Sequence, residues 1–230
     1  MTLNEIVYDI WELYRRRIKD DDTVDRRMIA NWIHIQRALW ISNQLNKGKW
    51  DESYVQDFGK TELQNVNTSE ISTIPSDTYI KRSTVTIPKL VVVNNDIALT
   101  RIGPYDFMES EYTLVPFSVF MKVGSGRFNR TNIYSTVKDS YIYVKSCKNS
   151  IYFSALKYIN VRGVAENPED LRSYQKPDGT YCYTDNSDYP LDRKLYAYMK
   201  EAIVKFNFPI LAAASEDVLN NATDDTGRRT

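Results

Sequence analysis

The sequence has little of the side-chain chemistry on which enzymes and metal-binding scaffolds depend. Its 230 residues include one histidine, His34, and two cysteines, Cys147 and Cys182. Two cysteines cannot form a disulfide framework or a four-ligand zinc set, and one histidine cannot form a histidine cluster. We therefore expect folding in a reducing cytoplasm, no bound metal, no cofactor and no enzymatic activity. A structural or simply exposed histidine is the expected role of His34.

The sequence also lacks net charge and long apolar runs. The 30 Lys and Arg residues balance the 30 Asp and Glu residues, which argues against a dedicated nucleic-acid or anionic-membrane binder. No run approaches the roughly 18 apolar residues that a membrane-spanning helix needs. The opening residues, MTLNEIVYDIW, have neither the basic region nor the continuous apolar region of a signal peptide. We therefore expect a soluble chain without a membrane segment.

Two helices are predicted at the start of the chain. Thr2 and Glu5 have the spacing of a capping box, and apolar residues then recur with helical periodicity, which predicts a helix over residues 3–19. A second helix is expected over residues 23–46, with Asp22 or Asp25 as its N-cap and Gly48 as its stop. The segment RRRIKDDD then joins a basic helix end to an acidic helix start, and each charge suits the helix dipole.

The second helix carries more apolar surface than one intrachain partner can cover. Its two apolar stripes are Met28, Trp32, Ile35 and Leu39, and Ile29, Ile33 and Trp40. The first helix can cover one stripe, and the other needs the β part of this chain or a neighbouring chain. We predict that Ile29, Ile33 and Trp40 form a subunit interface, and an intrachain core is the alternative.

The remainder of the chain predicts an α+β fold in four regions. Residues 1–80 form the helical segment with an irregular linker, and 81–165 form a small antiparallel β domain rich in strand-like runs. Residues 166–214 return to the helical part, with a short helix started by Asn167 and Pro168 and an amphipathic helix that Pro209 ends or restarts. Residues 215–230 form an extended tail. The 17 tyrosines suit either strands or subunit contacts.

The polar tail has few anchors of its own and is predicted to order on a partner. We expect it to dock on a neighbouring subunit or an adjacent ring through a small set of residues. These are Val218, Leu219, Asn220, Asn221, Asp224 and Asp225.

Two loops contain residues of the kind that chemical sites use. GSGRFNR, residues 124–130, has no following helix to make a phosphate cradle, and a turn is favoured over one. Arg127 and Arg130 in this loop could contact DNA or another protein. Asp106, Glu109 and Glu111 cluster in a second loop, but their spacing does not fit a calcium loop.

The order of these segments resembles a phage protein family. The opening MTLNEIVYDIW, the segment DDDTVDRRMIANWIHIQRALWISNQLNKGK, the Tyr-rich β domain and the Asn/Asp-rich tail are similar to head-to-tail connector proteins, also called ring or adaptor proteins. These belong to crAss-like and other short-tailed Bacteroidetes phages. The resemblance implies a structural virion protein that forms a closed ring below the portal, usually twelve-fold. It would be assembled in the host cytoplasm and contact the portal, neighbouring rings and passing DNA.

Alternatives remain open at this point. A tail-tube or nozzle ring component would have the same overall character. A β-domain binding or adhesion module with a helical attachment would instead expose aromatic residues in a cleft. The zero net charge departs from the basic channel expected of a DNA-gripping ring.

Overall fold

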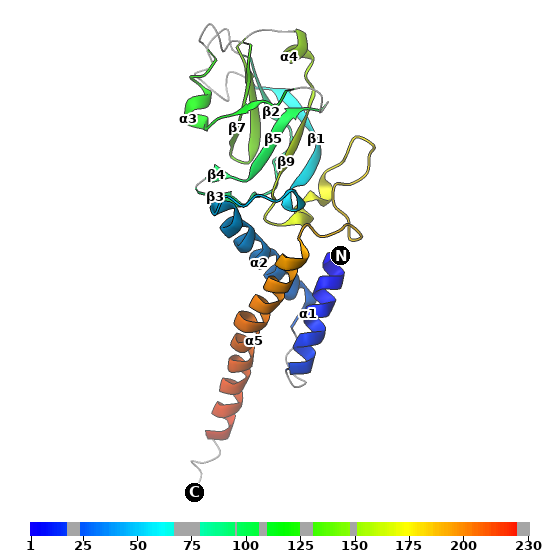
Figure 1. Cartoon of the computed structure of the whole chain (residues 1–230), viewed down its shortest axis with the longest axis vertical. Coiled ribbons are helices and arrows are strands. Elements are labelled where there is room, and N and C mark those ends of the chain that lie inside the picture. The colour runs from blue at the N-terminus through cyan, green and yellow to red at the C-terminus, as the bar shows by residue number, and fades with distance from the viewer. Residues whose placement is uncertain are drawn as a thin grey trace. The chain divides into compact units, whose positions relative to one another are not determined.

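The chain forms two compact units in the computed structural model shown in Figure 1. Residues 1–54 and 185–230 make up the helical unit, and residues 55–184 make up the sheet unit. The structure describes residues 1–17, 24–66, 79–94, 96–105, 110–124, 131–147 and 151–224, with side chains as far as residue 208 in the last range. The fold is α+β, as the sequence predicts, but the unit boundaries differ from the predicted ones at 80 and 165.

The helical unit contains α1 (Leu3–Arg17), α2 (Arg26–Asn46), the short 3-10 helix η1 (Glu52–Tyr54) and α5 (Arg193–Asp224). The predicted capping box is confirmed, because the Thr2 amide donates to Glu5 at 2.8 Å and the Glu5 amide donates to the Thr2 hydroxyl at 3.3 Å. Asp25 is the N-cap of α2, and Gly48 follows its end with a φ of +71°. The structure describes the first helix as far as Arg17, and residues 18–23, including Asp22, lie outside the described residues.

The C-terminal helix is longer than the sequence predicts. Pro209 does not end α5, which continues to Asp224, so the expectation of an extended tail is wrong over residues 215–224. A proline removes one backbone hydrogen bond, but Ala212, Ala213 and Ala214, which begin three residues later, are alanines, the residue type with the highest helix propensity. Residues 225–230, including Asp225, lie outside the described part.

The three long helices of this unit share one apolar core. It includes fully buried residues from α1, α2 and α5, such as Ile6, Ile10, Ile33, Leu195 and Met199. Tyr14 of α1 packs edge-on against Phe208 of α5, with ring centroids 5.2 Å apart. The periodic apolar residues that predicted these helices therefore also hold them together.

Asp9 ties α1 to α5. Its carboxylate accepts hydrogen bonds from Lys200 Nζ at 2.6 Å and from the Tyr196 hydroxyl. Burial alone raises the pKa of Asp9, but the bonds from Lys200 and Tyr196 outweigh it and the pKa falls below its ordinary value of 3.8. A lowered pKa means that the folded state favours the ionised carboxylate.

We expect Asp9→Asn to reduce stability near neutral pH and to have no effect in strong acid. The contribution of Asp9 is complete above its unfolded-state pKa and disappears as the pH falls through the lower folded-state value. Urea midpoints of both proteins, measured from about pH 6 to about pH 2, should converge at the acid end. A midpoint difference that stays constant across this range would contradict the assignment.

The sheet unit is built on a seven-stranded sheet of order β5-β9-β1-β2-β8-β7-β6. All neighbouring strands are antiparallel except β6 and β7. A separate hairpin pairs β3 with β4. The strands are β1 (Gln56–Asn65), β2 (Tyr79–Ser83), β3 (Val92–Val93), β4 (Asp96–Ile97), β5 (Leu99–Pro104), β6 (Thr113–Leu114), β7 (Ile133–Lys138), β8 (Tyr141–Ser146) and β9 (Tyr158–Gly163).

Strand β1 was missed by the sequence prediction, which made residues 47–80 irregular. It lies at the centre of the sheet although it contains only two large apolar residues, Phe58 and Leu63. A bulge between Asp57 and Lys60 places Gly59 at a φ of +69°. A Cβ at Gly59 would lie 2.2 Å from the Gln175 carbonyl oxygen, so glycine is required there.

Two segments predicted as strands are short helices instead. These are α3 (Phe117–Phe120) and α4 (Ile151–Ala155). Along the chain, β8 is followed by α4. A tight hairpin joins β7 to β8 through Asp139 and Ser140, whose φ values of 51° and 64° fit a type I′ turn.

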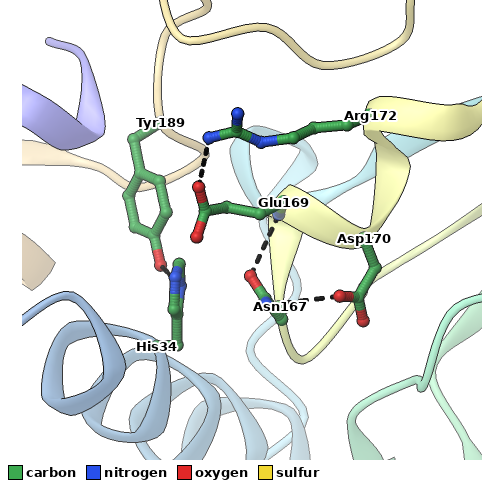
Figure 2. Close-up of polar contacts among 6 residues, drawn as sticks. All are labelled: His34, Asn167, Glu169, Asp170, Arg172 and Tyr189. Carbon is green, nitrogen blue, oxygen red and sulfur yellow. Dashed lines mark hydrogen bonds and ion pairs between the residues drawn. The ribbon is translucent and has the colours of Figure 1, made fainter. Parts of the chain in front are cut away.

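The short helix predicted at Asn167 is confirmed as the 3-10 helix η2 (Pro168–Ser173). Asn167 caps it by accepting a bond from the Glu169 amide at 3.0 Å, and its own amide donates to Asp170 at 3.2 Å (Figure 2). Arg172 closes the turn through its bond to Glu169.

Two buried lysines fasten the short helices α3 and α4 to the sheet. Lys145 Nζ donates to the carbonyl oxygens of Phe120, Met121 and Val123 at 3.1, 3.0 and 2.9 Å. Lys81 Nζ donates to Ser154 and Leu156 at 3.0 and 2.6 Å. Because Lys145 pairs with Ile80 and Lys81 pairs with Val144, the two lysines point to opposite faces of the sheet. Each face thus holds the C-terminal end of one helix.

Candidate assembly surface

Helix α2 has apolar side chains on two opposite faces. One face is buried in the helical unit and includes Ile29, Ile33 and Ile41. The opposite face exposes Met28, Ile35 and Leu39, whose side chains are 36%, 47% and 55% accessible. At 3.6 residues per turn these three lie within about 40° of one another around the helix. We call them the α2 stripe.

The structure buries two of the three residues predicted to form the subunit interface. Ile29 and Ile33 are fully buried inside the helical unit, so they are not available to a neighbouring chain. Trp40 is half-buried and packs against Tyr54 and Tyr198, with centroid distances of 5.9 and 6.4 Å. The burial of Ile29 and Ile33 argues against the interface predicted for those two residues, and for the partly accessible Trp40 it stays a prediction.

A polar cluster on α2 holds the two segments at which the chain leaves and re-enters the helical unit. Arg37 is fully buried and donates through Nε to the Pro190 carbonyl at 2.8 Å and through Nη2 to the Tyr54 carbonyl at 3.5 Å. His34 Nδ1 lies 2.8 Å from the Tyr189 hydroxyl, a contact drawn in Figure 2. Both side chains thus have structural partners, which is the role expected for His34.

Electrostatics in this cluster favour neutral tyrosine. Burial and the nearby carboxylates of Asp192 and Asp51 raise the pKa of Tyr54 to about 12. The Tyr54 hydroxyl therefore keeps its proton near neutral pH. The sequence analysis did not identify Arg37 as a structural residue. Arginine is usually exposed, and nothing in the helical pattern indicates that this one is buried.

The two loops that carry the candidate chemical residues lie mostly outside the described part of the chain. Arg127, Arg130, Asp106 and Glu109 lie outside the described residues. Glu111 lines a cleft of about 600 Å³ in the sheet unit. Its lining includes Tyr112 and Tyr152, whose hydroxyl oxygens are 3.3 Å apart. Within the part of the chain that the structure describes, no group of three or more His, Cys, Asp and Glu could hold a metal ion.

Of the two cysteines, Cys182 lacks the lowered pKa of a reactive thiol. Burial, followed by the neighbouring Asp57 carboxylate, raises the pKa of Cys182 to about 11. A thiol with so high a pKa stays protonated near neutral pH and is a poor nucleophile. Cys147 lies against the Val123 carbonyl, with its sulfur 3.7 Å from the oxygen.

The sequence matches one family almost from end to end. Residues 5–226 match the family model described as phage tail ring protein 2, of the crAss phages. A search of curated proteins found no match. Over the described residues, no helix combines the length and apolar character needed to cross a membrane.

Proposed function

The chain belongs to the family of phage tail ring protein 2, and from this premise we propose that it is a subunit of a head-to-tail connector. In this proposal identical subunits close into a ring below the portal, join the capsid to the tail and surround the DNA passage. The protein acts as a structural part of the virion and carries out no chemical reaction.

The observation that carries the proposal is the exposed α2 stripe. A ring subunit contacts two neighbouring copies through two different faces. A self-complementary contact would give a dimer, whereas a contact between two different faces can repeat around a closed ring. Met28, Ile35 and Leu39 provide an apolar centre for one such face. A stable interface covers roughly 800 Å² on each partner, so the polar side chains around the stripe also belong to the contact.

The other partners follow from the position of the ring in the virion. We propose a ring of twelve subunits, with the portal above it and a further ring below it. The equal numbers of acidic and basic residues suit a channel through which DNA passes without tight binding. The C-terminal segment from Ser215 onward is the proposed contact with the neighbouring layer, helical as far as Asp224.

We expect the double substitution Ile35→Asp and Leu39→Asp to abolish ring formation and leave folded monomers. Each aspartate would place a charge at the apolar centre of the contact, which costs several kcal/mol when it is left unpaired. Sedimentation velocity of the wild-type and variant proteins gives the masses, and circular dichroism reports whether the variant is folded.

Phe206→Asp is the matched control for this experiment. Phe206 is 65% exposed on a different helix, α5, and its replacement also puts an aspartate in place of an exposed apolar side chain, one instead of two. This control should assemble like the wild type. Normal assembly of the double variant would remove the α2 stripe from the interface, whereas a wild-type protein that stays monomeric at every soluble concentration would contradict the ring itself.

A further inference from the structure

We infer that the second lateral face of each subunit is the outer surface of α1, centred on Tyr8 and Trp11, and that it receives the α2 stripe of the next copy. This inference rests on the proposed ring and names the surface that the ring requires in addition to the α2 stripe. A contact between two α2 stripes would be self-complementary and would produce a dimer, so the occupant of the stripe must be a different surface.

The outer surface of α1 is a continuous stripe. Asn4, Tyr8, Trp11 and Arg15 recur at helical spacing and lie within about 60° of one another around the helix. The opposite side of α1 is buried and packs on α2 and α5. Tyr8 is 56% exposed, while Trp11 is half-buried. We call these four residues the α1 face.

Trp11 is held in place before any partner binds. The guanidinium carbons of Arg15 and Arg26 each lie 4.7 Å from the Trp11 ring centroid. The Tyr8 ring lies beside it, with centroids 6.3 Å apart and planes inclined by 39°. Because these side chains are already ordered, their immobilisation in a contact costs little entropy. Tyrosine, tryptophan and arginine are also the residues that most often dominate binding energy at interfaces.

The two faces are chemically complementary. The α2 stripe consists of the aliphatic and thioether side chains of Met28, Ile35 and Leu39, with no charge to be buried unpaired. The α1 face offers aromatic rings, which pack well against such side chains and against methionine sulfur in particular. Since α1 and α2 pack on each other through their buried sides, these outer faces point away from the shared core in different directions.

The exposed aromatic residues of α5 fit the role less well. Tyr198 and Phe206 are separated by about 80° around the helix, so they do not form one stripe. Glu201 and Lys205 lie on the exposed surface of the same segment and form an ion pair of 2.6 Å with each other. Tyr198 already packs against Trp40.

The test uses two variants that are each disabled on one face. Tyr8→Asp places a charge on the α1 face and should block binding there. Ile35→Asp with Leu39→Asp places two charges on the α2 stripe and should block binding through that surface. Each variant keeps the other face intact. Each should therefore be monomeric alone, and a mixture of the two should form a 1:1 complex of twice the subunit mass and nothing larger, measured by sedimentation.

The possible outcomes separate this inference from the proposed function. If Tyr8→Asp alone forms rings, the α1 face is not part of the contact. The same conclusion follows if the two monomeric variants form no complex at any soluble concentration. Neither result would contradict the proposed ring. A monomeric wild type would instead overturn the ring. Unchanged circular dichroism and melting temperature of both variants, with normal assembly of Phe206→Asp, exclude misfolding as the cause.

Discussion

Replacing Arg37 with methionine is expected to lower the free energy of unfolding of the helical unit by about 2–4 kcal/mol. Methionine keeps most of the length and apolar contact of the arginine side chain but removes its donors. The carbonyl oxygens of Pro190 and Tyr54 then lose the bonds that the guanidinium supplies in a fully buried site. The segments before Val55 and after Thr184 would lose their common attachment to α2.

Tryptophan fluorescence measures this effect selectively. All four tryptophans, Trp11, Trp32, Trp40 and Trp50, belong to the helical unit. Urea unfolding followed by tryptophan emission should therefore shift to lower urea in Arg37→Met. The matched control is Arg27→Met on the exposed surface of the same helix, which should change stability by no more than about 0.5 kcal/mol. Equal midpoints for the two variants would show that the bonds of Arg37 contribute nothing net.

Replacing Lys145 with methionine is expected to destabilise the sheet unit by about 2–4 kcal/mol. The Lys145 ammonium group is the donor for three carbonyl oxygens at the end of α3, and the side chain is almost fully buried. Burial lowers the pKa of Lys145, which shows that the buried charge has a cost. Three carbonyl bonds offset that cost, and methionine would leave all three oxygens without their donor.

The sheet unit contains no tryptophan, so its unfolding is followed separately. Far-ultraviolet circular dichroism and hydrogen exchange of β8 and α3 should report the loss in Lys145→Met, while the tryptophan transition stays in place. Lys157→Met is the control, because Lys157 is exposed in the same unit. If Lys145→Met and Lys157→Met unfold alike, the packing of α3 does not depend on the lysine.

Local sequence signals determined much of the secondary structure. Thr2 with Glu5 and Asp25 marked helix starts correctly, and Asn167 with Pro168 marked η2, because each cap depends only on residues within one turn. The α+β class followed from the change in apolar period along the chain. The resemblance to ring proteins was also read from the sequence, and the family match over residues 5–226 confirms it.

Only the tertiary structure decided which apolar stripe of α2 is buried. Both stripes satisfy the same helical period, and α1 and α5 cover Ile29 and Ile33 while leaving Ile35 and Leu39 accessible. The same limit explains β1, which is a central strand because β2 and β9 supply its hydrogen bonds from elsewhere in the chain. Arg37 and Lys145 look like surface residues in the sequence. Their burial depends on carbonyl oxygens of segments remote along the chain, which no local pattern records.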